Sequence, residues 1–182
     1  MWSRALLFYR AADPNDVALD LSDAHAHSRF ENTARPGRYA LYLVREAPDV
    51  PPPADGAVES HALVVVREFR RVPLDASGLG LMVFVARPGR AAQVIATLAH
   101  WAERAVSLYQ PNYLLLARSQ DQPGLTALIT GVQEGRALEW SRPSPFSVDL
   151  VLPEVAPFLL AAPERYRYCP EGVAAAVSPD AV

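Results

Sequence analysis

The side chains best suited to chemistry in this sequence are aromatic. Trp101 falls in a regular helical pattern, where it is either plain core or the wall of a cavity. Tyr109 and Tyr113 flank a turn whose Asn112 is explained by ordinary turn chemistry or by a role in a site. Trp140 falls between regular elements, where aromatic residues are better functional candidates than those of a core. These side chains are candidates for lining a ligand site, each beside a structural alternative.

Basic side chains and histidines offer a second set of candidates. Arg118 ends an apolar strand, where it is either exposed to solvent or an anchor for a phenolate. His61 opens another strand and could act as an acid or base near neutral pH. His25 and His27 have the spacing of a metal pair, but no third ligand cluster accompanies them, and a solvated segment is the alternative. The sequence therefore predicts no metal site and no cofactor.

Composition excludes several classes of protein. The chain has 182 residues, of which 51% are hydrophobic and 20% are charged. A net charge of −3 argues against nucleic acid as the main partner. No apolar run approaches the roughly eighteen residues of a membrane span. The lone Cys169 rules out an internal disulfide framework and favours the cytoplasm. All basic residues are arginine, which excludes a lysine Schiff base.

The elements that must position these candidates are short apolar strands and a few helices. Apolar runs bounded by turn residues predict strands at 4–11, 39–46, 61–72, 79–86, 112–119, 124–133 and 164–171. A spacing of three and four residues predicts a long helix after residue 89, with its apolar face made by Val94, Leu98, Trp101, Ala105 and Leu108.

Two further segments are less regular. Residues 16–30 alternate like a strand in their first part, but the preceding Asp-Pro-Asn favours the start of a helix, and a helix is our expectation there. A last helix is expected to begin at Ser144, with Pro145 at its first position. Pro153 and Pro157 must break or kink that helix.

The order of these elements predicts an α+β fold with antiparallel ferredoxin-like sheets, complete in the second half and truncated in the first. The strands are apolar at successive positions, so both faces of each sheet require burial. A second sheet is the economical cover, and two facing sheets form a barrel. We expect halves at 1–72 and 73–174 and a flexible tail at 175–182. The partner sheet could come from the first half or from a second subunit, and a homodimer is favoured because exposed apolar faces aggregate.

The second half, about residues 78–170, resembles the antibiotic biosynthesis monooxygenase family, a group of dimeric α+β barrels. The resemblance rests on "VFVARPGRAAQVIATL", "QPNYLLLARS", "GLTALITGVQ" and "SPFSVDLVLPEVAPFLLAAPERYRY". Residues 1–72 could be a degenerate copy of the same unit. Their opening, "SRALLFYRAADP", is also similar to the start of small aromatic polyketide cyclases, which share the barrel.

The resemblance implies oxidation of an anthrone-type substrate in an apolar cavity without metal, haem or flavin. The family's Asn, Trp and Tyr positions fall on Thr130, Glu134 and Trp140, none of which is the expected type. Thr130 could still bind a substrate oxygen and Trp140 could still stack, so the catalytic candidates are Trp140, Thr130 and Arg118. The candidates for substrate binding are Trp101, Tyr109, Tyr113, Phe84 and His61.

Three functions remain open from the sequence. The first is a cofactor-independent monooxygenase acting on an aromatic polyketide. The second is a polyketide cyclase or aromatase, which would use the same apolar barrel for ring closure without oxygen. The third is a non-catalytic binding or assembly protein of a biosynthetic complex, which the departures from the family's Asn-Trp-Tyr set make credible.

Overall fold

The computed structural model describes residues 3–10, 24–32, 38–45, 59–71, 79–109, 113–131 and 151–170. The strands in these stretches are β1 (Ser3–Arg10), β2 (Ala24–Asn32), β3 (Arg38–Arg45), β4 (Glu59–Arg70), β5 (Leu79–Val85), β6 (Tyr113–Ser119), β7 (Leu125–Gly131) and β8 (Glu164–Pro170). The helices there are α1 (Ala91–Tyr109), the short α2 (Leu152–Val155) and the 3-10 turn η5 (Ala156–Phe158).

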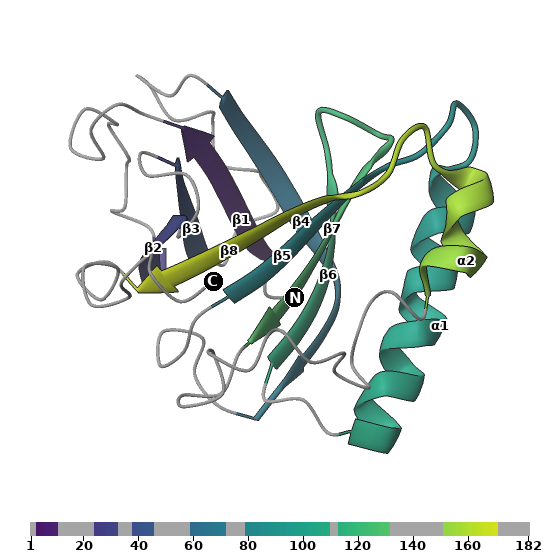
Figure 1. The fold of residues 1–182 in the computed structure, drawn as a ribbon. Helices are drawn as coiled ribbons and strands as arrows, with labels where there is room; N and C mark the ends of the chain where they lie inside the picture. The colour runs from purple at the N-terminus through teal and green to yellow at the C-terminus, as the bar shows by residue number, and fades with distance from the viewer. Residues whose placement is uncertain are drawn as a thin grey trace, which may run out of the picture.

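The strands close into a barrel in the order β1-β3-β2-β8-β5-β7-β6-β4, with β4 returning to β1 (Figure 1). Every neighbouring pair is antiparallel. The order β4-β1-β3-β2 of the first half repeats the order β8-β5-β7-β6 of the second half, and this is the ferredoxin-like order. The prediction of an α+β protein with ferredoxin-like antiparallel sheets is therefore confirmed.

Two seams join the halves into one barrel. At the β4–β6 seam the pairing runs from Leu63 opposite Ser119 to Arg70 opposite Tyr113. At the β2–β8 seam the pairing covers Phe30 to Asn32 of β2. The partner sheet is thus supplied by the same chain, and the apolar strand faces that favoured a homodimer are covered internally. The homodimer stays a prediction.

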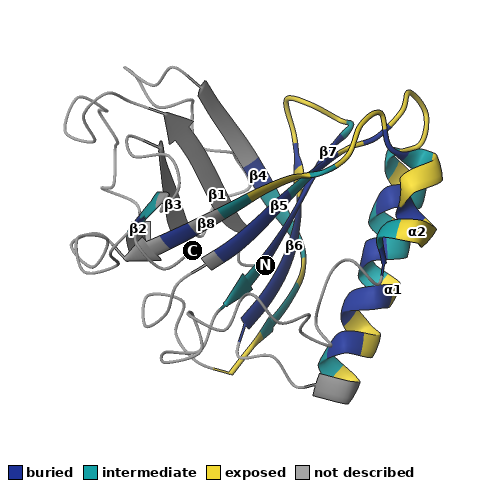
Figure 2. Ribbon diagram, in the orientation of Figure 1, coloured by how far each residue is buried: buried dark blue, intermediate teal, exposed yellow. Residues whose placement is uncertain are grey.

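Both faces of the β5–β7 region are buried, as the apolar runs predicted (Figure 2). An inner cluster lies inside the barrel and consists of Phe30, Leu63, Leu81, Tyr113, Leu115, Ala117, Leu125, Ala127, Ile129 and Tyr168. An outer cluster lies between the sheet and the helices and consists of Met82, Phe84, Ala86, Val94, Leu98, Trp101, Ala102, Ala105, Leu114, Leu116, Leu128, Val151, Val155 and Leu159. Alternate residues of each strand enter the two clusters, because successive side chains of a strand point to opposite faces.

Helix α1 and the hairpin that follows it agree with the sequence pattern. Val94, Leu98 and Trp101 are buried against the sheet, while Glu103 and Arg104 are exposed on the other side of the helix. β6 and β7 then form an antiparallel hairpin, as the intervening turn residues predicted. Among the residues that the structure describes, no helix has the length and apolar character needed to cross a membrane.

The helix expected over residues 16–30 is wrong for the part of that segment that the structure describes. Residues 24–32 form β2, which pairs with β3 on one side and with β8 on the other. Whether a segment forms a strand depends more on pairing with neighbouring strands than on its own sequence. The Asp-Pro-Asn signal before residue 16 is therefore not enough to predict a helix. The first part of the segment, residues 16–23, lies outside the described residues.

Of the two prolines expected to break the last helix, Pro157 does so, whereas Pro153 lies in the first turn of α2, where proline is tolerated. α2 spans only Leu152–Val155 and has proline in its first positions. η5 begins at Ala156 and again has proline near its start. A proline ring clashes with the preceding turn of a helix, so Pro157 prevents α2 from continuing. The expected start at Ser144 and Pro145 lies outside the described residues.

Trp101 offers a direct test of the outer cluster. The side chain is 6% exposed, so Trp101→Ala should remove its contacts with the sheet and leave a cavity. We expect the free energy of unfolding to fall by about 3–5 kcal/mol in urea denaturation. Leu160→Ala is the control, because Leu160 is 66% exposed and should lose little. Equal losses in the two variants would contradict the packing of α1 described above.

Thr126 offers a second test, because its buried hydroxyl has no hydrogen-bond partner in the described part of the chain. It lies opposite Phe84, under the helices. Thr126→Val keeps the shape and removes the unsatisfied hydroxyl, so we expect the free energy of unfolding to rise by about 1–3 kcal/mol. The matched control is Thr130→Val, which removes a hydroxyl that donates to Gly80 O at 3.5 Å. The same destabilisation in both variants would show that the Thr126 hydroxyl is satisfied.

Candidate functional site

The candidate site begins with an irregularity in β4. Val65 lies opposite Ala117 of β6, while Arg67 lies opposite the adjacent Leu116, so β4 carries one extra residue, Val66. Such a bulge changes which side chains face each side of the sheet beyond it. Strict alternation from Leu63 and Val65 would have placed Arg67 inside the barrel.

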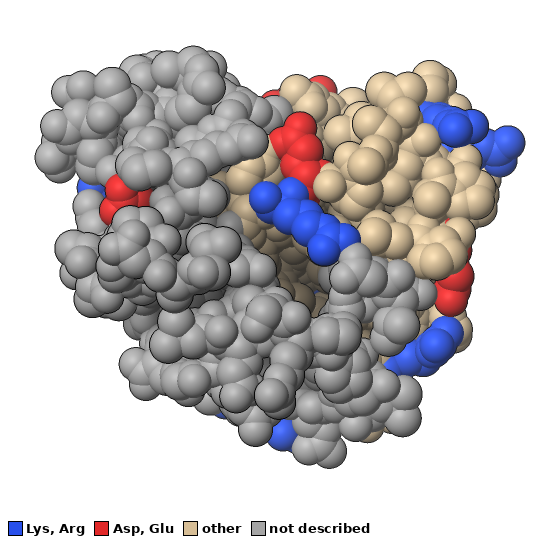
Figure 3. All heavy atoms as spheres, viewed as in Figure 1, with Lys and Arg blue, Asp and Glu red and all other residues tan. Residues whose placement is uncertain are grey.

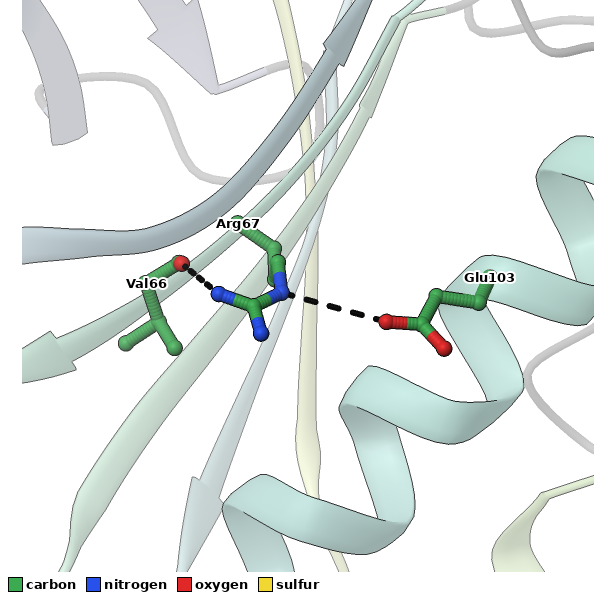
Figure 4. A network of polar contacts seen from close by, with 3 residues as sticks. All are labelled: Val66, Arg67 and Glu103. Carbon is green, nitrogen blue, oxygen red and sulfur yellow. Dashed lines mark hydrogen bonds and ion pairs between the residues drawn. The ribbon is translucent and has the colours of Figure 1, made fainter.

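Arg67 lies on the outer side instead (Figure 4). Its Nη1 donates to the carbonyl oxygen of Val66 at 3.1 Å, and its Nε lies 3.9 Å from Oε1 of Glu103 on α1. Both charged side chains are more than half exposed, so the ion pair itself contributes little stability. The ion pair shows that the side chain of Arg67 points toward the helix side, where strict alternation would have placed it inside the barrel.

Beyond the bulge, polar residues reach the inner face of the barrel. Glu68 lies opposite Leu115, and Arg70 lies opposite Tyr113. Leu115 and Tyr113 both belong to the inner cluster. Directly opposed residues of an antiparallel pair project from the same face, so Glu68 and Arg70 also leave β4 on the inner side.

Tyr113 and Glu68 form a direct contact on that inner face. The hydroxyl of Tyr113 donates to Oε1 of Glu68 at 3.3 Å, which is a long hydrogen bond. Tyr113 is fully buried, whereas Glu68 is half-buried. The pair therefore places a carboxylate at the boundary between the apolar interior and solvent, with a phenol behind it.

The surroundings of this pair are apolar. The residues paired across the sheet at the level of Glu68 run from β4 to β8, through Leu115, Ile129, Leu81 and Tyr166. Leu115, Ile129 and Leu81 are buried, so the interior is packed at this level. Accessible inner positions lie at its margins, where Val65, Glu68, Val83 and Tyr166 are half-buried.

Two tyrosines of β8 extend this inner surface. The rings of Tyr166 and Tyr168 have centroids 6.3 Å apart and are tilted by 38°. Tyr168 is buried in the inner cluster, and the hydroxyl of Tyr166 donates to the carboxylate of Glu164. In Figure 3 the face toward the viewer has a hollow in which uncharged atoms are visible, with acidic and basic side chains across its upper part.

This arrangement can perform proton transfer. A carboxylate beside apolar surface can accept a proton from a bound molecule, and a phenol within reach of it can hold the carboxylate in place or donate to a developing oxyanion. Among the residues that the structure describes, no group of three potential metal ligands lies together.

Among the predicted site residues whose side chains the structure describes, Tyr113 enters this inner surface. Thr130 and Arg118 alternate with inner residues and so project toward the helix side, where Arg118 is exposed. Trp101 and Phe84 are buried in the outer cluster between sheet and helix. The candidate site therefore leaves out Thr130, Arg118, Trp101 and Phe84, whose predicted roles had assumed the cavity face.

The remaining predicted residues are only partly described. His61 belongs to β4 opposite Phe8 of β1, and Tyr109 ends α1, but their side chains lie outside the described part. The same holds for the side chains of His25 and His27 on β2. Trp140 and Glu134 lie wholly outside the described residues. Their roles stay predictions.

Sequence comparison alone gives no relatives: no family model matches the chain, and no curated protein is similar to it in sequence. Solved structures do resemble it. An anthrone oxidase-like protein has a TM-score of 0.61 at 8% identity and covers 93% of this chain and 91% of its own. A ferredoxin-fold protein from Listeria monocytogenes, related to antibiotic biosynthesis monooxygenases, has a TM-score of 0.52 at 9% identity, covering 92% of this chain and 95% of its own.

A third similar structure has a different kind of role. A major regulator of staphylococcal pathogenesis has a TM-score of 0.65 at 9% identity and covers 92% of this chain and 99% of its own. At these identities the likeness shows the fold, and the fold is the one that the sequence resemblance implied. The same fold thus accompanies a protein described as anthrone oxidase-like and a protein described as a regulator.

The hydroxyl of Tyr113 can be tested apart from its ring. Tyr113→Phe removes the long hydrogen bond to Glu68, so we expect the free energy of unfolding to fall by about 0.5–1.5 kcal/mol. Tyr113→Ala removes a fully buried ring and should cost about 3–5 kcal/mol. Urea denaturation measures both. If Tyr113→Phe were as unstable as Tyr113→Ala, the hydroxyl itself would be required for stability of the fold.

Proposed function

We propose that the protein is a cofactor-independent monooxygenase that oxidises an anthrone-type aromatic polyketide. The observation that carries the proposal is the half-buried Glu68 carboxylate, hydrogen-bonded to the buried Tyr113 at the edge of an apolar interior. The likeness of the fold to an anthrone oxidase-like protein supports the choice of substrate.

Glu68 would act as the base. The CH2 group of the anthrone loses a proton to the carboxylate, and the resulting carbanion transfers electrons to dioxygen, which bonds to that carbon. The product of this step is a hydroperoxide once the proton returns. Loss of water then leaves a carbonyl, so each CH2 group consumes one O2 and releases one water. The electrons come from the substrate, so no further reductant is required.

Tyr113 would position this base and stabilise charge. As the anthrone loses its proton, negative charge develops on its carbonyl oxygen. The single O–H of Tyr113, which donates to Glu68 while that carboxylate is charged, can turn to donate to this oxygen once Glu68 has taken the proton. The leucine and isoleucine side chains beside the pair would keep water from the buried side of the carbanion and so limit its reprotonation there.

Oxygen-dependent turnover tests the proposal. The purified protein should convert an anthrone to its quinone with uptake of O2, with metal chelated throughout. Glu68→Gln should lower kcat by about 10²- to 10⁴-fold, as expected for loss of a general base, and Tyr113→Phe should lower it less. Glu103→Gln is the matched control, because Glu103 is an exposed glutamate on α1 and should leave kcat unchanged.

Other outcomes would replace the proposal. Ring closure of a nascent polyketide without oxygen, also lost in Glu68→Gln, would favour the cyclase, because the same base suits an aldol reaction. Binding of such ligands without turnover would favour a non-catalytic role, which the likeness to a regulator makes reasonable. Equal loss of activity in the Glu68 and Glu103 variants would remove Glu68 from the mechanism.

A further inference from the structure

An arginine lies next to the proposed base and has no role in the proposed reaction. Arg70 is two residues beyond Glu68 on β4 and pairs directly with Tyr113 of β6. Since Tyr113 enters the inner cluster, Arg70 leaves the sheet on the same inner side. The side chain is exposed, so it lies where that side opens to solvent.

Within the described part of the chain, the guanidinium of Arg70 forms no hydrogen bond or ion pair. Two other arginines of the described chain are engaged: Arg67 contacts Val66 and Glu103, and Arg87 donates to the carbonyl oxygen of Leu159. For Arg70 the described residues supply no hydrogen bond or ion pair, although Glu68 lies on the same face. The carboxylate of Glu68 instead accepts from Tyr113.

We infer that Arg70 recognises a carboxylate on the aromatic substrate and so restricts the site to aromatic acids. A guanidinium presents two parallel N–H groups that match the oxygens of a carboxylate. A planar acid with its rings against the inner surface would place its carboxylate at Arg70 and its reactive carbon toward Glu68. A phosphate is disfavoured, because its second charge would lie close to the Glu68 carboxylate. The aromatic part of the inference rests on the proposed function.

Binding of two fluorescent probes tests this without turnover. The probes are anthracene-2-carboxylic acid and its uncharged amide, titrated into the full chain in the absence of oxygen. We expect the acid to bind about tenfold more tightly than the amide, since one charge-assisted pair is worth that much or more. Raising the salt concentration should reduce the preference, because the arginine is exposed.

Variants assign the preference to Arg70. Arg70→Gln should bind the acid and the amide equally, and Arg70→Lys should keep part of the preference, because it retains the charge but loses the paired donors. Arg104→Gln is the control, because Arg104 is an exposed arginine on α1 and should keep the full preference. Circular dichroism should show both glutamine variants folded.

The outcomes separate this inference from the proposed function. A preference for the acid that Arg70→Gln removes supports the inference, even if neither probe nor any anthrone is oxidised. Equal binding of acid and amide by the unaltered protein, an undiminished preference in Arg70→Gln, or binding of neither probe would overturn it. Oxidation of an uncharged anthrone as fast as its carboxylated analogue would overturn it while leaving the proposed function in place.

Discussion

The pairing of β4 with β6 is the constraint on which the rest of this structure depends. It joins the two halves of the barrel along Leu63 to Arg70, and its single extra residue, Val66, decides which side chains of β4 face inward. Without that residue the strand would present Arg67 to the apolar interior, where a lone charge is costly. With it, Arg67 contacts the helix side, and a glutamate at the margin of the barrel meets a tyrosine.

The two layers of packing have different consequences. The outer cluster fixes α1 on the sheet through apolar contacts. Thr126 differs, because its buried hydroxyl has no hydrogen-bond partner among the described residues. The inner cluster is apolar in its middle and polar at its β4 margin, where Glu68 and Arg70 lie. Proton transfer and charge recognition can therefore occur at the margin without placing an unpaired charge in the core.

Periodic features of the sequence predicted the fold well, while local irregularities could not be predicted. The spacing of Val94, Leu98 and Trp101 indicated α1, and the apolar run before the β6–β7 turn indicated a strand buried on both faces. The run "LVVV" in β4 is apolar at every position, so it gives no sign of where a bulge falls, and a shift of one residue exchanges Glu68 for Arg67. For the same reason the sequence does not reveal whether Thr130 and Arg118 face the inside of the barrel or the helices, and the structure places both on the helix side.

Because the barrel closes within one chain, the two seams need not be formed by the same residues. In a barrel built from two copies of one subunit, every substitution occurs twice and closure weakens on dilution. Here the halves are tethered, so closure is independent of protein concentration. The seams can also diverge: the β4–β6 seam carries Glu68 and Tyr113, whereas Phe30 and Tyr168 lie at the β2–β8 seam. The strand order of one half is thus repeated in the other, while the side chains at the two seams differ.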